Sequence, residues 1–205
     1  MPSISKSLRR DVAAGILCGG RSRRMGQSKA MLPGRGQHTL IDLATDRVAD
    51  AFEFVVLLFA DPTQVPDLPG VQGAEMAFDA VPSSGPVAGI ASGLHWASER
   101  GARGLLVAPI DMPSLTLGDQ LRLLPTASNT HTIRVAMDTV SGQLQPLVGY
   151  YPVDLAEAMQ CHAASAERSM MRLLDQIEHE RIEFPPDRLL NLNTPDDYQA
   201  WIASQ

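Results

Sequence analysis

Short apolar runs alternate with stretches of helical periodicity along most of the chain. Residues 12–17, 54–59 and 104–108 are apolar runs of strand length without regular polar alternation. Between them, residues 40–51 and Pro86–Glu99 carry apolar side chains at helical spacing. Strands that alternate with helices are typical of sheets whose neighbouring strands run in the same direction. The pattern therefore predicts an α/β domain with a mainly parallel central sheet.

The remaining apolar segments are shorter and extend the same pattern. They predict strands at Glu75–Phe78, 133–137 and 147–151, and helices at 153–162 and 169–176. These elements alternate like those before them, so we assign them to the same sheet and its covering helices.

A final helix has a well-defined start. Thr194 suits the N-cap, Pro195 suits the first helical position, and the two aspartates that follow suit the positive end of the helix dipole. The sequence contains no internal repeat and no linker long or polar enough to divide the chain. We therefore predict a single domain over residues 11–205, preceded by a flexible N-terminal extension at residues 1–10.

Charge and composition exclude several classes of function. The 205-residue chain carries a formal net charge of −6, whereas non-specific nucleic-acid binders usually have a basic face. No apolar stretch reaches the roughly 18 residues of a membrane span. The two cysteines, Cys18 and Cys161, provide neither a disulfide framework nor a zinc site, as expected in a reducing cytosol. The sequence thus predicts a cytoplasmic protein that binds neither nucleic acid nor membrane.

The segment from Leu17 to Lys29 has the composition of a phosphate-binding loop. It follows the first predicted strand and contains three glycines and four cationic side chains. Glycine lets backbone N–H groups approach an anion closely, while Arg24 and Lys29 offer charge to phosphate oxygens. A solvated basic turn is the alternative, but such a turn does not need the Gly19-Gly20 pair after a strand. The spacing differs from both the dinucleotide-binding and the Walker motifs.

This loop resembles the Leu-x-Gly-Gly-x-x-x-Arg-Met-Gly-x-x-Lys signature of the molybdenum cofactor guanylyltransferases, which belong to the nucleotidyltransferase superfamily. Three further segments resemble elements of that family, in the same order along the chain: Gly85-Pro86-Val87-Ala88-Gly89, Pro109-Ile110-Asp111-Met112-Pro113 and Asn191-Leu192-Asn193-Thr194-Pro195-Asp196. The matches run from residue 12 nearly to the end of the chain. The resemblance implies a Rossmann-like three-layer α/β/α domain.

The resemblance also implies roles for individual residues. The implied nucleotide-binding residues are Leu17, Cys18, Gly19, Gly20, Lys29, Asp79 and Asp111. Asp111 would in addition bind the cofactor Mg²⁺, and Lys29 would contact the phosphates. Two departures from the family pattern stand out. Cys18 replaces the usual alanine, and residues 57–59 stand where many members have an asparagine near the nucleotide.

Asp111 suits a metal site independently of the resemblance. It follows a predicted buried strand, and open α/β sheets bind ligands beyond the carboxyl ends of their strands. Magnesium usually takes one or two carboxylates and leaves its other positions to phosphate oxygens and water. Pro109 and Pro113 would hold this segment stiffly. The alternative is an aspartate that caps a helix after Ser114.

The implied reaction transfers GMP from GTP to Mo-molybdopterin and releases pyrophosphate. Arg24, Lys29 and Asp111 are the predicted catalytic residues, because nucleotidyl transfer depends on alignment and charge neutralisation rather than on a general base. The predicted acceptor-binding residues are Gln145, Arg168, Asn191 and Asn193. For the two asparagines, the alternative is a turn before a capped helix. For Arg168 it is a solvated helix residue.

Other functions stay open on the sequence alone. A cytidylyltransferase of the same superfamily would make the cytosine form of the cofactor, but that branch resembles Ala-Gly where this chain has Gly19-Gly20. Other small-molecule nucleotidyltransferases match the glycine-rich elements less well. A non-catalytic nucleotide or cofactor carrier would not need Lys29 and Asp111 together. The expected partners are GTP, Mo-molybdopterin, and molybdoenzyme chaperones or other proteins of cofactor biosynthesis.

Overall fold

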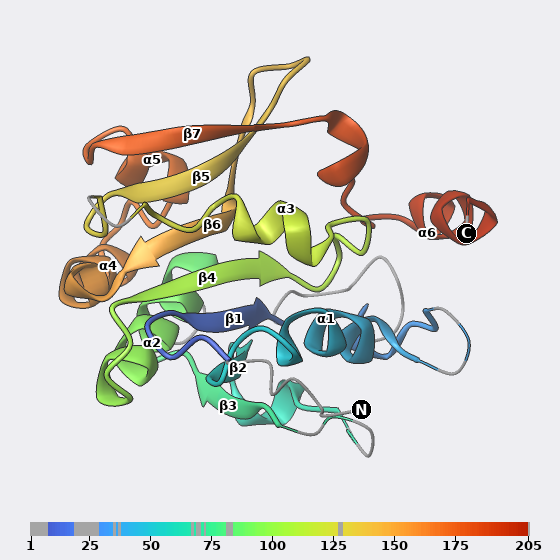
Figure 1. The fold of residues 1–205 in the computed structure, drawn as a ribbon, viewed down its shortest axis with the longest axis horizontal. Helices are drawn as coiled ribbons and strands as arrows, with labels where there is room; N and C mark the ends of the chain where they lie inside the picture. The colour runs from blue at the N-terminus through green and yellow to red at the C-terminus, as the bar shows by residue number, and fades with distance from the viewer. Residues whose placement is uncertain are drawn as a thin grey trace, which may run out of the picture.

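A seven-stranded sheet forms the centre of the molecule (Figure 1). The computed structural model describes residues 8–18, 29–34, 36, 38–66, 68, 71, 73–80, 84–126 and 129–204. The strands are β1 (Ala13–Leu17), β2 (Val55–Phe59), β3 (Glu75–Phe78), β4 (Gly104–Pro109), β5 (Ile133–Asp138), β6 (Leu144–Pro152) and β7 (His179–Phe184). Their order is β3-β2-β1-β4-β6-β5-β7, and only β6 is antiparallel to its neighbours. The predicted mainly parallel sheet is confirmed.

The three central parallel strands are buried on both faces. Every residue of β1, β2 and β4 is buried, which explains why their sequences are continuous apolar runs. The strand β7 lies at one edge of the sheet, and three of its six residues are charged: Glu180, Arg181 and Glu183. Because its sequence lacks an apolar run, we did not predict it.

Helices cover both faces of the sheet and complete three layers. The helices are α1 (Leu40–Ala49), α2 (Pro86–Glu99), α3 (Leu117–Leu121), α4 (Ala156–Ala164), α5 (Met170–Leu174) and α6 (Pro195–Ala203). The first face is covered by α2, α4 and α5, and the second by α1 and α3 (Figure 1). Alternate residues of β1, β2 and β4 contribute to the two apolar clusters. The Rossmann-like three-layer α/β/α domain is therefore confirmed.

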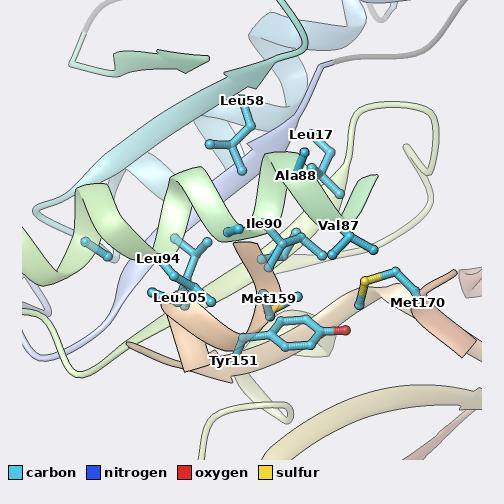
Figure 2. Packing of buried hydrophobic residues seen from close by; sticks show 14 of the residues in the cluster. Leu17, Leu58, Val87, Ala88, Ile90, Leu94, Leu105, Tyr151, Met159 and Met170 are labelled. Atoms are coloured by element: carbon cyan, nitrogen blue, oxygen red, sulfur yellow. The ribbon is translucent and has the colours of Figure 1, made fainter. Parts of the chain in front are cut away.

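The core beneath α2 joins this helix to β2 and β4. Ile90 and Leu94 of α2 pack with Leu58 of β2 and Leu105 of β4, and Met159 of α4 belongs to the same cluster (Figure 2). These five side chains are almost fully buried. Burying an aliphatic side chain of this size stabilises a fold by about 1.5–3 kcal/mol. This layer thus holds α2 and α4 against the sheet.

Most predicted helices appear with small changes at their ends. The helix α2 spans the predicted residues, and α6 begins at Pro195 after the N-cap Thr194, as predicted. The predicted helix at residues 153–162 is divided into a 3-10 turn and α4, and α5 is shorter than predicted. The 3-10 turns are η1 (Lys29–Met31), η2 (Pro62–Gln64), η3 (Val153–Leu155) and η4 (Pro186–Arg188).

The C-terminal helix α6 packs away from the sheet (Figure 1). Its Trp201 joins a small buried cluster with Leu32, Leu40 and Leu192. Leu32 directly follows η1, and Leu192 belongs to the segment before α6. The cluster therefore brings the end of the chain beside the turn that carries Lys29.

The N-terminal segment is described from residue 8 onward. Arg9 forms an isolated parallel bridge with Phe52, and its backbone N–H donates to the carbonyl of Ala51 at 2.9 Å. Residues 1–7 of the predicted extension lie outside the described part of the chain. Within the described ranges, no helix is long and apolar enough to cross a bilayer.

Candidate active site

Polar side chains follow the carboxyl ends of four neighbouring strands. Cys18 follows β1, Asp61 lies just after β2, Asp79 follows β3, and Asp111 lies two residues after β4. These strands are parallel, so their carboxyl ends meet at one edge of the sheet. Ligands of open α/β sheets bind at this edge.

Asp111 and Lys29 form an ion pair at this edge. The Nζ atom of Lys29 lies 2.7 Å from Oδ2 of Asp111, and the two side chains are only 17% and 18% exposed. The pair joins η1, at the end of the predicted phosphate loop, to the segment after β4. A partly buried charge-assisted hydrogen bond of this length is a strong contact. The structure thus brings two of the three predicted catalytic residues together.

The segment before α6 contacts both members of this pair. The side-chain amide of Asn191 faces Asp111 and donates to Oδ1 at 2.8 Å and to Oδ2 at 2.9 Å. This orientation of the amide follows from the hydrogen-bond network, because the reverse would set its oxygen against the carboxylate. Lys29 donates to Oδ1 of Asn193 at 3.1 Å. Both asparagines, predicted to bind the acceptor, therefore contact the predicted catalytic residues.

Two arginines that the sequence did not single out hold the loop after Asp111. Arg47 of α1 donates to the carbonyl of Pro113 at 3.3 Å, and Arg188 of η4 donates to the carbonyl of Ser114 at 3.3 Å. Burial lowers the pKa of Arg47 to about 10, against the opposing effect of the Asp119 carboxylate. In the sequence, each arginine resembles an ordinary solvated cation, since only the tertiary fold brings it to the loop.

Leu17 and Cys18, two of the predicted nucleotide-binding residues, lie at the carboxyl end of β1. The carbonyl of Leu17 accepts from the N–H of Ile110 at 3.2 Å, and the N–H of Cys18 donates to the carbonyl of Leu58 at 2.9 Å. Burial raises the pKa of the Cys18 thiol, and its Sγ contacts the carbonyl of Ile16 at 3.3 Å. A half-buried thiol with a raised pKa stays neutral and is a poor nucleophile. The geometry of Cys18 therefore does not support a nucleophilic role.

Asp79 lies beside the start of α2. An added Cβ at Gly89 would come within 3.4 Å of Oδ1 of Asp79 and 3.2 Å of Cδ2 of Leu17, so the helix approaches both residues closely. Burial, and next the Asp61 carboxylate, raise the pKa of Asp79 to about 6. A carboxylate with a raised pKa beside a helix start is a candidate functional group.

The other predicted residues are placed less centrally. Gln145 lies in β6, which runs antiparallel to β4, so this start of β6 is at the same edge as Asp111. Arg168 is exposed between α4 and α5, and its Nε donates to the carbonyl of Ser165 at 3.2 Å. Gly19, Gly20 and Arg24 lie outside the described residues.

A metal ion at this site would depend on Asp111. Among the described residues, His, Cys, Asp and Glu form no group of three or more that could hold a metal by itself. Asp111 therefore supplies one carboxylate, with the amide of Asn191 against it. A single carboxylate fits Mg²⁺, which commonly takes one or two carboxylates and completes its shell with phosphate oxygens and water.

Solved structures share this fold. Molybdopterin-guanine dinucleotide biosynthesis protein A from Archaeoglobus fulgidus aligns with a TM-score of 0.75 at 22% identity, over 94% of this chain and 98% of that one. A Mycobacterium tuberculosis H37Rv protein, solved in complex with manganese, aligns with a TM-score of 0.66 at 17% identity, over 95% of this chain and 100% of that one. The chain therefore has the fold of these proteins, and at the carboxyl ends of its strands it pairs a cation with a carboxylate.

Sequence comparison identifies the family. The model of the MobA-like NTP transferase domain matches residues 14–182, and the chain belongs to this family. A Rhodopirellula baltica protein named "Probable molybdenum cofactor guanylyltransferase" is 37% identical over 187 residues, which cover 89% of this chain and 87% of the relative. The resemblance found in the sequence motifs is confirmed.

Proposed function

We propose that the protein transfers GMP from GTP to Mo-molybdopterin, which releases pyrophosphate and forms the guanine dinucleotide cofactor. The observation that carries the proposal is the Lys29–Asp111 pair at the carboxyl end of β4. It combines a phosphate-binding cation with a metal-binding carboxylate. The family and the related guanylyltransferase support the same reaction.

The nucleotidyl transfer reaction requires mainly alignment of the two substrates and neutralisation of charge. A phosphate oxygen of the acceptor attacks the α-phosphorus of GTP, the bond to the bridging oxygen breaks, and pyrophosphate leaves with that oxygen. The attacking oxygen is already ionised, so no general base is required. Holding the two reactants in line supplies a large part of such a rate enhancement. The protein's part is therefore to bind both substrates at the strand ends.

Asp111 would hold Mg²⁺ in this reaction. The metal would neutralise charge on the phosphate oxygens that bind to it. The manganese in the Mycobacterium tuberculosis structure supports use of a divalent cation in this fold. Asp111 sits on a stiff segment fixed by Arg47, Arg188 and the N–H of Leu192, which donates to its carbonyl at 2.8 Å. Such fixation keeps the carboxylate in place when phosphates bind.

Lys29 and Arg24 would offset the charge that develops on the α-phosphate and on pyrophosphate. Lys29 is the first residue of η1, and its side chain contacts Asp111 and Asn193. From this position the ammonium group would reach phosphates bound at the same edge of the sheet. Once phosphates bind, they compete with Asp111 for the ammonium group. A lysine can make this change because its charge sits on a flexible stem.

Guanine would be bound at the ends of β1 and β3. The backbone of Leu17, Cys18, Gly19 and Gly20 would match the polar edge of the base, and Asp79 would contact the nucleotide. At neutral pH Asp79 is mostly ionised, since its pKa of about 6 lies below the ambient pH. The acceptor would bind beyond the carboxyl end of β4, near Gln145. Arg168 would lie at the edge of the acceptor site. Asn191 and Asn193 would lie next to it, in contact with Asp111 and Lys29.

Product formation tests the proposal directly. Purified protein is incubated with GTP and Mo-molybdopterin, with and without Mg²⁺, while pyrophosphate and the dinucleotide product are measured. We expect both products in equal amounts, and only with the divalent cation. Binding of GTP or of the cofactor without pyrophosphate release would instead identify a carrier.

After the transfer reaction we expect a delivery step, in which a molybdoenzyme chaperone or another protein of cofactor biosynthesis receives the dinucleotide product.

A further inference from the structure

The Asp111 carboxylate is held by a neutral donor as well as by a cation. Asn191 donates to both oxygens, at 2.8 and 2.9 Å, while Lys29 donates to Oδ2 alone at 2.7 Å. An ionised carboxylate has about four acceptor sites. The three contacts leave room on Oδ1 for one further partner. When Lys29 turns to the phosphates, a place on Oδ2 becomes free as well.

The backbone around Asn191 keeps it in register with Asp111. The next residue, Leu192, donates its N–H to the carbonyl of Asp111 at 2.8 Å. Its side chain is 2% exposed and is anchored in the cluster with Leu32 and Trp201. The amide of Asn191 is therefore aimed at the carboxylate by a main-chain contact and by a buried side chain, and not by its own rotamer alone.

Asn193 has a different partner and a different environment. It is exposed, and its Oδ1 accepts from Lys29 at 3.1 Å. Its N–H donates to Oδ2 of Asp197 at 3.0 Å, within the cap of α6. The two asparagines of one short segment thus separate two tasks: one contacts the carboxylate and the other contacts the lysine.

We propose that Asn191 is a positioning residue that orients the Asp111 carboxylate toward the metal ion. The inference rests on the proposed function for the identity of that ion. A neutral amide fixes the carboxylate without adding a charge that would repel a cation, which distinguishes it from Lys29. Outer contacts of this kind typically change metal affinity by about 10–100-fold when they are removed.

The test measures Mn²⁺ binding to the nucleotide-free protein by water proton relaxation. Asn191→Leu keeps a similar volume but has no donor, and Asn191→Ser serves if that variant fails to fold, since its hydroxyl is too short to reach both oxygens. We expect Mn²⁺ to bind about tenfold or more weakly. The KM for GTP at saturating Mg²⁺ should change little, and the thermal midpoint should stay near that of wild type. Asn193→Ala should keep Mn²⁺ affinity close to wild type, because Asn193 contacts Lys29 instead.

Two results would overturn the proposal. One is unchanged Mn²⁺ affinity in the Asn191 variants. If the KM for Mo-molybdopterin rises at the same time, Asn191 is an acceptor-binding residue instead. The other is an equal loss of affinity in Asn193→Ala, which would assign the effect to the whole segment. The binding measurement uses neither GTP nor acceptor. If wild type forms no dinucleotide, the proposed function fails while the Asn191 result still stands.

Discussion

The ammonium nitrogen of Lys29 lies 2.7 Å from a carboxylate oxygen of Asp111, although 82 residues separate them in the chain. The contact spans the edge where β1 and β4 end, and it connects the end of the predicted phosphate-binding loop to the predicted metal ligand. Lys29 and a divalent cation would both be attracted to the same carboxylate. This relationship determines what substitutions at either residue should do.

Asp111→Asn should abolish most turnover and leave the fold intact. An amide is a much weaker magnesium ligand than a carboxylate, and its nitrogen would face the ammonium of Lys29 or the amide of Asn191. Pyrophosphate release at saturating Mg²⁺ measures the loss, and circular dichroism checks the fold. Asp50→Asn, at an exposed position after α1, is the matched control and should turn over normally. Near-normal release by Asp111→Asn would show that Asp111 is not the metal ligand.

Lys29→Ala should move turnover and metal binding in opposite directions. Turnover should fall by about 10²-fold, as when one donor to a transition-state charge is removed. Affinity for GTP should fall less, because Arg24 and the loop amides still contact phosphate. Mn²⁺ alone should bind the variant more tightly, since no ammonium competes for Asp111.

Steady-state kinetics and proton relaxation measure the two effects. Arg172→Ala, which removes an exposed cation of α5, is the control and should change neither. A loss of GTP affinity with unchanged turnover would assign Lys29 to ground-state binding.

The sequence was sufficient to predict the fold class because β1, β2 and β4 are continuous apolar runs. A strand such as β2 is buried at every position, so its five apolar residues in a row could be recognised without the structure. The strand β7 could not, since its polar residues lie at a sheet edge and only its last residue is fully buried. The antiparallel direction of β6 depends on the chain's path and leaves no local pattern.

In the candidate site, too, some residues could be predicted from the sequence and others could not. Lys29 and Asp111 could be found because they stand in motifs that follow strands. The contacts of Asn191 could not, because its segment has the sequence of a turn before a capped helix, and the partner of its amide lies 80 residues earlier. Arg47 was missed for a similar reason, as it occupies the last turn of α1, where a cation is ordinary.

Asp79→Asn should stabilise the protein at neutral pH and much less in acid. Burial and Asp61 raise the pKa of Asp79 to about 6, so the fold favours its protonated form. In wild type the free-energy cost of ionising Asp79 is absent well below pH 3.8, grows as the pH rises from there to about 6, and then stays constant. Because the asparagine side chain cannot ionise, the variant does not lose this part of its unfolding free energy.

Urea unfolding from about pH 4 to about pH 8 measures the difference between variant and wild type. Asp50→Asn controls for the loss of a carboxylate at an exposed site. A difference that does not widen with rising pH would show that the pKa of Asp79 is not raised in the folded protein.

Gly104→Ala should destabilise the fold without touching the site. A Cβ at the first residue of β4 would collide with the ring of Tyr150 on the neighbouring strand. Overpacking of this kind costs roughly 1–3 kcal/mol of unfolding free energy. In Gly118→Ala the nearest atom to the added Cβ is Oγ1 of Thr116 at 3.7 Å, so this control should stay within about 0.5 kcal/mol of wild type. Equal stability of both variants in urea would contradict the packing described for β4 and β6.

The choice of base tests the guanylyltransferase account most directly. Guanine presents N1–H and N2–H donors and an O6 acceptor, and glycines at positions 19 and 20 would let the backbone approach that edge. Adenine reverses the donor and acceptor there, which leaves buried groups unpaired at about 1–3 kcal/mol each. Cytosine is smaller and should lose both contacts and stacking.

The measurement is kcat/KM for pyrophosphate release with Mo-molybdopterin and each of the four nucleoside triphosphates in turn. We predict that GTP exceeds CTP and ATP by at least about 50-fold. Comparable or faster turnover with CTP would contradict the guanylyl assignment, while leaving the fold and the roles proposed for Lys29 and Asp111 in place.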